Sequence, residues 1–495
     1  MIETILNPLN LPSILVLIFT LFMCNWYIWK RVNKRQDVVE KGVYDIPGPV
    51  PLPFFGTRWL YSWIGGYKFE KIHEMYEVLF AKYGPIIKEE ALWNYPIVSI
   101  KEREDIEKVL RSVGKYPLRP PTEIVVHYRK NLPDRYSSLG LVNEQGETWH
   151  HLRTHLTSEL TSTRTISEFT PVVKDILHEW CDLIKQNRSN TGKIENVHVL
   201  AERFALEVTC ALVLGRRMGF LLSNELSDKS KRLSRAVKEH FLASRDTYYG
   251  LPFWKLVPTE SYSKFVKAQN EIYQIASELI QTADDSTQDS AVFQSVLHAP
   301  VDEKDKTTVI VDFIAAGIHT LANSLIFLLH LIGSNEDVQK TLKEHLKNGS
   351  NSYAKACVYE SFRVIPTAPC IARILDKDLQ LSGYNLKAGT VVLSHTGIAC
   401  RDERYFPNAK KFDPGRWLNE VKGANVHSLN AFLISPFGVG KRICPGKRFS
   451  EMVVTVALEI IMEHFKLECK EPLELVFEFL LAPKSSTSIY FHDDT

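Results

Sequence analysis

The feature that most constrains the fold is a long apolar segment in the second half of the chain. Thr308–Ile332 reads TVIVDFIAAGIHTLANSLIFLLHLI and is apolar on nearly every side of a helix. Such a helix has to be surrounded, either by lipid or by a protein core. As a membrane span it would hold His319 and Asn323 near the bilayer centre, which costs several kcal/mol. We therefore expect a helix through the core of a folded domain, with Gly317 marking a close approach by another group.

The rest of the sequence predicts a large, mainly helical body. Of the 495 residues 45% are hydrophobic, enough to bury a sizeable core. No glycine-rich phosphate loop follows a strand pattern, which argues against a built-in nucleotide-binding domain. Helical periodicity is clear in Phe69–Tyr83, Thr148–Leu160, Pro171–Lys185 and Ser450–Phe465. Short strand patterns occur at Ile86–Glu90, Ile97–Lys101, Gln380–Leu381, Thr390–Ser394 and Ser488–His492. The expected fold class is mainly α with small β-sheets.

Charge and cysteine content exclude several kinds of protein. A formal net charge of +2 lacks the dense basic field of a nucleic-acid binder. The 8 cysteines show neither C-x-x-C nor paired spacing, unlike a disulfide scaffold or a structural zinc site. Most of them are therefore expected to be buried thiols in a reducing compartment.

The amino terminus predicts a membrane anchor. Leu11–Trp29 carries no charge, and as a helix it would roughly match a hydrocarbon core of about 30 Å. Four basic residues between positions 30 and 35 place the following domain in the cytoplasm. A cleaved signal peptide is the alternative, but bulky residues stand where a cleavage site should be. We divide the chain into an anchor with its basic flank (1–35), a proline-rich linker (36–66) and a main domain (67–495).

One cysteine stands in a loop that suggests chemistry. Phe437–Phe449 reads FGVGKRICPGKRF, and its glycines permit a tight turn before Cys444. Pro445 is tolerated at the first position of a helix, so Cys444 falls at or next to a helix cap that favours a thiolate. Gly446 leaves room for a flat ligand against the helix, and Arg442 could reach a carboxylate on that ligand.

This loop, F-x-x-G-x-R-x-C-x-G, resembles the haem-binding loop of the cytochrome P-450 superfamily. The resemblance implies haem b (iron protoporphyrin IX) with Cys444 as the axial iron ligand, and Phe437, Gly438, Arg442 and Gly446 around it. A thiolate ligand pushes electron density onto iron and favours O–O cleavage. The resemblance thus implies the cytochrome P-450 fold for the catalytic domain (67–495) and a monooxygenase that inserts one oxygen atom of dioxygen into its substrate.

Further superfamily patterns follow one another along nearly the whole chain. Glu360-Ser-Phe-Arg363 matches E-x-x-R, and Phe412–Trp417 matches F-x-P-x-R-W. Trp149-His-His-Leu-Arg153 matches W-x-x-x-R. By resemblance, the structural residues are Glu360, Arg363 and Arg416, with the last locked onto the other two, and the propionate-binding residues are Trp149, Arg153 and Arg373.

Ala316-Gly-Ile-His-Thr320 resembles the family's A-G-x-[D/E]-T on the long buried helix. By this resemblance Thr320 orients dioxygen and relays protons, while Gly317 opens the helix beside the oxygen site. His319 replaces the usual carboxylate: it either donates a proton near neutral pH or is a hydrogen-bonded core residue with the relay running through water. The Thr320 hydroxyl could instead bond back to its own helix.

Segments before the long helix resemble the mitochondrial branch of the superfamily, which includes steroid hydroxylases. Arg119–Ile124, Pro133–Ser137 and Leu141–Gly146 are similar to the insect ecdysone 20-hydroxylase family. The implied substrate is ecdysone, a rigid polyhydroxylated steroid that needs an apolar pocket with a few polar groups. Apolar candidates are Ile124, Val125, Phe313, Ala316, Ala368 and Leu481, and polar candidates are Thr122, Thr367 and Ser485.

Electron donor and compartment stay open at this stage. By the same resemblance, a basic patch of Lys355, Lys447 and Arg448 is expected to receive an acidic ferredoxin, supplied by its reductase, which fits the mitochondrial inner membrane. The anchor instead fits the endoplasmic reticulum and a microsomal NADPH reductase. The stretch Leu342–Lys355 is short for the superfamily, so a surface helix is expected to be missing. Alternative functions are oxidation of another steroid, lipid or xenobiotic, a haem-thiolate isomerase, and a non-catalytic haem- or sterol-binding protein.

Overall fold

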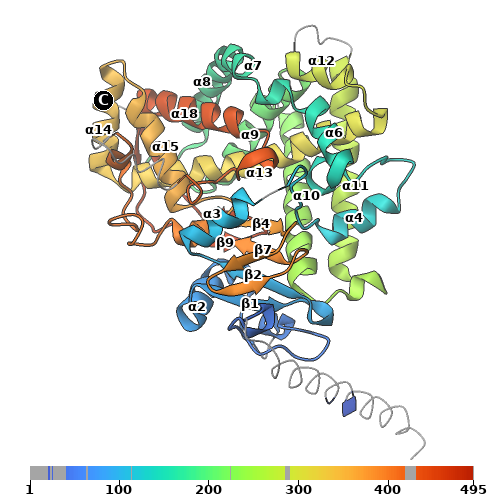
Figure 1. Ribbon diagram of the computed structural model, residues 1–495. Coiled ribbons are helices and arrows are strands. Elements are labelled where there is room, and N and C mark those ends of the chain that lie inside the picture. The colour runs from blue at the N-terminus through green and yellow to red at the C-terminus, as the bar shows by residue number, and fades with distance from the viewer. Residues whose placement is uncertain are drawn as a thin grey trace, which may run out of the picture.

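The computed structural model describes residues 21–22, 25, 41–62, 65–112, 114–222, 224–284, 290–418 and 431–493. Most of the predicted anchor and all of its basic flank lie outside the described residues. The described chain is mainly helical with small sheets, as predicted (Figure 1). The main helices are α2 (Ile72–Tyr83), α4 (Glu123–Lys130), α6 (Gly146–Leu156), α8 (Thr170–Asn187), α9 (Val197–Leu214), α10 (Asn224–Tyr249), α11 (Glu260–Asp284), α13 (Glu303–Gly333), α14 (Glu336–Lys347), α15 (Ser352–Val364) and α18 (Lys447–His464).

Helix α13 is the centre of the packing (Figure 1). Its amino-terminal end is capped by the Asp302 side chain, which accepts a hydrogen bond from the Lys304 amide. Its carboxyl-terminal half packs in an apolar cluster with α8, α9, α15 and α18, and its amino-terminal half packs with α6, α9, α10 and α11. Among the described helices it alone is long and apolar enough to span a bilayer, but most of that apolar stretch is buried by protein. The prediction of a core helix is confirmed.

Gly317 is where α9 comes close to α13. A Cβ atom built on Gly317 would lie 2.5 Å from Thr209 Oγ1 and 2.7 Å from Thr209 Cγ2, far inside contact distance. The predicted close approach therefore exists, and its partner is a side chain of α9. The expectation that this glycine opens the helix beside an oxygen site has to be corrected, because its missing side chain faces the neighbouring helix.

A four-stranded sheet lies beside the helices, in the order β1-β2-β7-β4. The strands are β1 (Ile86–Glu90), β2 (Pro96–Ile100), β7 (Val391–Ser394) and β4 (Ile371–Ile374), with β2 and β7 parallel and the other pairs antiparallel. The remaining strands are β3 (Lys193–Ile194), β5 (Leu379–Leu381), β6 (Tyr384–Leu386), β8 (Phe465–Glu468), β9 (Leu475–Phe477), β10 (Leu481–Pro483) and β11 (Ile489–Asp493). The predicted strand segments all match strands, with ends shifted by at most a residue.

The proline-rich segment expected to be a linker packs against the sheet. The Lys88 amide donates to Pro47 O at 2.9 Å, and the Thr57 amide donates to Glu90 O at 2.7 Å. A Cβ on Gly48 would lie 2.0 Å from Lys88 O, so only glycine allows this contact. Residues 46–57 therefore belong to the folded body. Further along the chain, residues 348–351 join α14 directly to α15, with no further helix between them.

The contact between α9 and α13 predicts the effect of filling Gly317. Gly317→Ala should lower the free energy of unfolding by about 1–2 kcal/mol, because overpacking against Thr209 outweighs the helix propensity that alanine gains. Thr209→Ala removes the two clashing atoms and should restore most of the loss, since Thr209 Oγ1 is buried without a hydrogen-bond partner. Denaturant unfolding of both single variants and the double variant measures this coupling. Additive effects would contradict it.

Candidate active site

The loop that carries Cys444 is a tight backbone turn before α18. Gly438 and Gly440 adopt φ values of +75° and +70°, which favour glycine. The Cys444 amide donates to Phe437 O at 2.8 Å, and this bond closes the loop. Helix α18 begins at Lys447 with Gly446 as its cap, so Cys444 stands two residues before the cap. Phe437 fixes the loop to the core through an edge-to-face contact with Phe362, with ring centroids 5.3 Å apart.

The thiol of Cys444 faces open space inside the protein. The residue is exposed, yet surrounding protein desolvates the thiol and raises its pKa. A side chain that lines an internal cavity is accessible and is also surrounded by desolvating protein. The Gly446 amide, Arg153 and Arg119 act in the opposite direction and favour the thiolate. A Cβ on Gly446 would reach only Cys444 Sγ at 3.8 Å and Ser450 Oγ at 4.0 Å, so the space beside the sulfur is open.

Four arginines converge near this thiol, on four different segments of the chain. They are Arg119, Arg153, Arg373 and Arg442. Burial and mutual repulsion lower the pKa of Arg442 to about 9, and burial and Arg119 lower that of Arg373 to about 10. Among the described residues none of the four forms an ion pair with a carboxylate. A buried group of cations without anions is costly, so the arrangement is suited to a ligand with more than one negative charge.

Two of these arginines are held in place by other groups. Arg442 donates from Nε to Pro117 O at 3.0 Å and from Nη2 to Glu144 O at 2.8 Å. Its guanidinium stacks over the buried Trp149 ring at 3.9 Å from the centroid. Arg373 is anchored by its own strand through Ala372 O, and its buried Nε has no hydrogen-bond partner. That unsatisfied donor belongs to a group predicted to bind an anion.

Glu360, Arg363 and Arg416 form the predicted buried cluster. Arg363 makes two hydrogen bonds of 2.8 Å to the Glu360 carboxylate, and Arg416 Nε makes another of 2.9 Å. Trp417 Nε1 also donates to Glu360, at 3.0 Å. Arg363 Nη1 reaches two backbone oxygens, Cys400 O and Ala409 O, both at 2.7 Å. The cluster therefore ties the segment before the cysteine loop to α15.

One face of α13 borders an internal space. Asp312, Ala316, Thr320 and Ser324 are all accessible, whereas most residues between them are buried. Residues four apart share a helix face, and an exposed alanine within a core helix indicates that this face has no packed neighbour. Arg129 of α4 pairs with Asp312, with Nη1 and Oδ2 3.1 Å apart, at one end of the face. Ser324 Oγ meets the Thr367 hydroxyl at 2.8 Å at the other end.

The two polar residues in the Ala316–Thr320 pattern point in different directions. Thr320 lies on the open face, and its hydroxyl donates to Ala316 O at 2.6 Å, as in the helix-bonded alternative. His319 is buried and faces α9 and α10, with Nδ1 3.1 Å from Glu202 Oε1 and Nε2 2.9 Å from Ser234 O. Both ring nitrogens are thus taken by acceptors on α9 and α10. This geometry favours the core interpretation of His319 over proton donation at the open face.

The His319 environment favours a charged ring. Burial alone would lower the pKa of His319, but the hydrogen bond and charge of Glu202 outweigh burial and raise it. A carboxylate and a carbonyl can both be satisfied only if both ring nitrogens carry protons. Glu202 also accepts from Ser234 Oγ at 2.6 Å. The three residues therefore bind α9, α10 and α13 to one another through one buried ion pair.

Comparison with known proteins decides the family. Residues 46–489 match the family model described as "Cytochrome P450". The chain belongs to the cytochrome P-450 family. A Drosophila melanogaster protein named "Ecdysone 20-monooxygenase" is 42% identical over 92% of this chain and 89% of its own. "Cytochrome P450 302a1, mitochondrial" of the same species is 29% identical over 88% of this chain and 91% of its own. A Mus musculus "1,25-dihydroxyvitamin D(3) 24-hydroxylase, mitochondrial" is 25% identical over 92% of this chain and 90% of its own.

As a cytochrome P-450, the protein is a haem-dependent monooxygenase, and its residues fit haem. An accessible thiol, an open strip beside Gly446 and an arginine cluster without carboxylates match the iron, plane and two propionates of haem b. The cluster brings together Arg153, Arg373 and Arg442, which the sequence predicted to bind haem, and that role stays a prediction. The sequence patterns assigned no haem contact to Arg119, although Arg119 stands in a segment that already resembled the family. Glu202 and Ser234 were missed as well, and no sequence pattern marks them.

The residues expected to line the substrate pocket divide into two groups. Ala316 is exposed, and Phe313, Thr367 and Ala368 are partly accessible, as a lining requires. Ile124 and Val125 instead pack in a cluster with Tyr128 and Trp254, and Leu481 packs against α2 and β9. Ser485 is exposed beyond β10. The expectation that Ile124, Val125 and Leu481 line the pocket is therefore corrected: an apolar side chain in a pocket wall can also point into the core behind it.

The ion pair between His319 and Glu202 predicts a pH dependence. The raised pKa of His319 means that its stabilisation is full below the unfolded value of 6.5 and is lost as pH rises through the folded pKa. The pKa of Glu202 is lowered in the folded protein. Its contribution to stability is therefore full above the unfolded pKa of 4.5 and is lost as pH falls through the folded pKa. The pair should therefore stabilise most between pH 4.5 and pH 6.5.

His319→Gln should lower the free energy of unfolding by on the order of 2 kcal/mol in that window and by less above it. Thermal unfolding of the unmodified protein and the variant across the pH range measures the difference. Glu202→Gln is the matched control, because it breaks the same pair from the other side. A difference in Tm that is constant with pH would mean that His319 is neutral in the folded protein.

Proposed function

We propose that this cytochrome P-450 hydroxylates ecdysone at carbon 20 and gives 20-hydroxyecdysone. The observation that carries the proposal is the 42% identity, over 92% of the chain, to the Drosophila melanogaster protein named "Ecdysone 20-monooxygenase". The open face of α13 supports it, because it combines the apolar Ala316 with hydroxyls of Thr320, Ser324 and Thr367. A polyhydroxylated steroid needs such a mixture of apolar surface and fixed polar groups.

In this proposal the Cys444 loop and the open face of α13 would hold the haem between them. Cys444 would bind the iron through its thiolate, with Phe437, Gly438 and Gly446 shaping the loop beside it. Arg442, Arg373, Arg153 and Arg119 would bind the propionates, and Trp149 would support Arg442 through its ring. When bound, haem supplies activation of dioxygen for oxygen insertion. The protein's own part is to hold the thiolate, neutralise the propionates and keep the propionate side dry.

Thr320 and His319 have different roles in the proposed reaction. Thr320 presents its hydroxyl on the open face, where it can turn from Ala316 O and hold a proton at Oγ1 for delivery to the oxygen site. Ala316 leaves room beside it. His319 acts as a positioning residue, since its contacts with Glu202 and Ser234 fix the turn of α13 that carries Thr320. Protons would then reach Thr320 through water.

The electron donor and membrane association complete the proposal. Lys355 and Arg448 are exposed, and Lys447 is partly accessible beside Glu451, so this basic patch can receive an acidic ferredoxin. The relatives named as mitochondrial support a ferredoxin donor and the mitochondrial inner membrane. Residues 1–35 are proposed as a membrane anchor, which supports instead the endoplasmic reticulum and a microsomal reductase. We infer the ferredoxin system, and the assay below includes both donors.

The haem ligand is tested by Cys444→Ala. The variant should lose the red-shifted absorption band of the reduced carbon monoxide complex, because that band requires a thiolate on the iron. Cys370→Ala is the control: Cys370 is also partly accessible near Arg119, and its removal should leave the band intact. If the band survives in Cys444→Ala, or disappears in Cys370→Ala, the assignment of Cys444 as the ligand is wrong.

The substrate is tested by incubating the purified protein with ecdysone, NADPH and either a ferredoxin system or a microsomal reductase. We expect one product, with the mass of ecdysone plus one oxygen and the retention of 20-hydroxyecdysone, and faster turnover with the ferredoxin system. A panel of fatty acids and xenobiotics is run in parallel. Turnover of the panel without oxidation of ecdysone under either donor would contradict the steroid assignment while leaving the haem-thiolate assignment untouched.

A further inference from the structure

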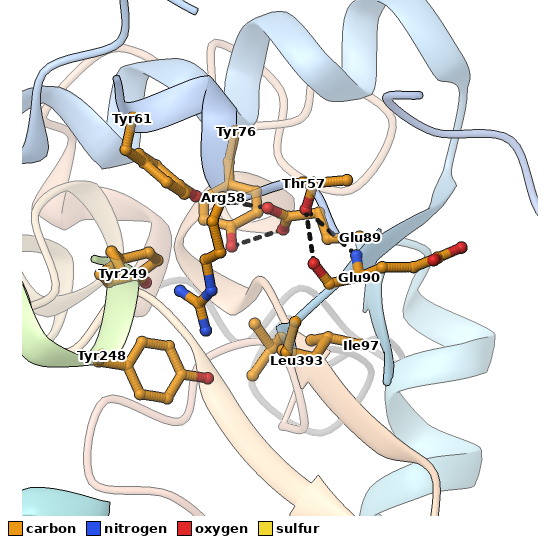
Figure 2. Close-up of a pocket in the computed structure, with 11 residues that line it drawn as sticks. Thr57, Arg58, Tyr61, Tyr76, Glu89, Glu90, Ile97, Tyr248, Tyr249 and Leu393 are labelled. Atoms are coloured by element: carbon orange, nitrogen blue, oxygen red, sulfur yellow. Dashed lines mark hydrogen bonds between the residues drawn. The ribbon is translucent and has the colours of Figure 1, made fainter. Parts of the chain in front are cut away.

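A small pocket lined by tyrosines lies beside the sheet, outside the arginine cluster (Figure 2). Its walls come from the segment after the proline-rich stretch, from α2, from β1, β2 and β7, and from the end of α10. The polar lining residues are Thr57, Arg58, Tyr61, Tyr76, Glu89, Glu90, Tyr248 and Tyr249. None of them belongs to the motifs that identify the family. The pocket therefore needs an explanation of its own.

Arg58 is the unusual residue in this pocket. Its guanidinium points into the space between the walls (Figure 2) and lies 5.6 Å from the centre of the Tyr248 ring. The Nε atom is buried without a hydrogen-bond partner. Among the described residues the guanidinium forms neither an ion pair nor a hydrogen bond. A buried donor without an acceptor costs free energy, so a bound group that supplies an acceptor would be favoured.

Glu89 does not neutralise Arg58 by direct contact. Its carboxylate accepts from the Tyr76 hydroxyl at 2.8 Å and from the Tyr61 hydroxyl at 3.3 Å (Figure 2). Burial raises the pKa of Glu89, with the two tyrosines and Arg58 acting against it. A carboxylate offers about four lone-pair positions, so after these two bonds it can still accept another. The pocket thus offers both a strong donor, Arg58, and an acceptor, Glu89.

Size and charge decide what the pocket can hold. Its free volume is about 10 Å³, which is the space of one water molecule. A phosphate or a carboxylate group is larger and would also be repelled by Glu89. A hydroxyl group is the size of water, and it donates and accepts at the same oxygen. The pocket therefore fits one alcohol hydroxyl, which would accept from Arg58 and donate to Glu89.

Strand β4 lies between the pocket and the arginine cluster, because Leu393 lines the pocket and pairs with Ala372, the residue before Arg373. Cys370 is close enough to Tyr248 and Tyr249 for its charge to raise their pKa values, and that of Tyr248 reaches about 12 mainly through burial. Both tyrosines therefore stay neutral donors. Arg119 in turn is a charged neighbour of both Cys370 and Cys444. A long rigid ligand lying along this line would meet the thiolate side at one end and the tyrosine pocket at the other.

We propose that this pocket is a hydroxyl-recognition subsite, in which Arg58, Glu89 and Tyr248 bind one hydroxyl of a polyhydroxylated steroid at the end remote from the oxidised carbon. The inference rests on the proposed function for the class of ligand. Beyond that function, the inference names the residues that distinguish steroids by the positions of their hydroxyl groups. A site built around a hydroxyl rejects an analogue without it strongly, because its buried polar groups then stay unpaired.

The test is a binding titration, followed by the change that a steroid causes in the haem absorption spectrum. The ligands are ecdysone and analogues that each lack one hydroxyl: 2-deoxyecdysone, 22-deoxyecdysone and 25-deoxyecdysone. Arg58→Met should raise the Kd for ecdysone about tenfold, the effect of losing a hydrogen bond from a charged group. One analogue should already bind the unmodified protein about tenfold more weakly, and Arg58→Met should not weaken its binding further.

Arg103→Met is the matched control, because Arg103 also lies 5.6 Å from the centre of a tyrosine ring, that of Tyr405, but outside the pocket. It should leave every Kd unchanged. Tyr248→Phe removes a single oxygen and should act in the same direction as Arg58→Met with a smaller effect. Tyr248→Phe replaces Arg58→Met as the test variant if Arg58→Met does not fold.

Equal losses for all ligands, or no loss in either pocket variant, would overturn the subsite. If the unmodified protein does not respond to ecdysone at all, the proposed function fails. The subsite is then decided with cholest-5-ene, cholesterol and 25-hydroxycholesterol, which carry no, one and two hydroxyls, and with the same variants. A tenfold preference for a sterol with a hydroxyl that disappears in Arg58→Met would support the subsite, and an equal response to all three would reject it.

Discussion

The structure depends on enclosing α13, a long apolar helix, without closing it on every side. Two apolar clusters cover most of its surface, and the contact between Gly317 and Thr209 brings α9 closer than any other residue at that position would allow. The face that carries Ala316 and Thr320 is left open because polar bridges span its ends, from Arg129 to Asp312 and from Ser324 to Thr367. Dense packing on one side and polar bridges on the other keep a cavity within a close-packed body.

The buried charged residues around this cavity fall into two groups. The ion pair of His319 and Glu202 and the cluster of Glu360, Arg363 and Arg416 are compensated internally, so they hold helices together. Arg119, Arg153, Arg373 and Arg442 form no ion pair with a described carboxylate, and burial lowers their pKa values. Buried charge that is balanced within the chain supports the fold, whereas buried charge that is unbalanced selects a ligand.

Much of the site was predictable because its residues lie within short patterns. Cys444, Glu360, Arg363 and the strand Ile86–Glu90 depend on neighbours along the chain, which a motif or a periodicity records. The partners of His319 come from α9 and α10, more than 80 residues away in the case of Ser234. Only the packing of three helices brings them together. The sequence also does not show which way a side chain points. It marks Gly317 as a point of close approach without showing which element approaches, and it does not show whether Ile124 faces the pocket or the core behind it.

The packing of residues 46–57 against β1 has a consequence for the sheet. In the order β1-β2-β7-β4, β1 is an outer strand, and its outward backbone groups would pair readily with a strand of another molecule. The bonds from Lys88 to Pro47 and from Thr57 to Glu90 occupy that side. The proline-rich segment therefore works as a cover for the sheet edge. A chain that begins at residue 67 would keep the whole cysteine loop and α13, but it would leave the outer side of β1 free to pair with another molecule, so its solubility should fall.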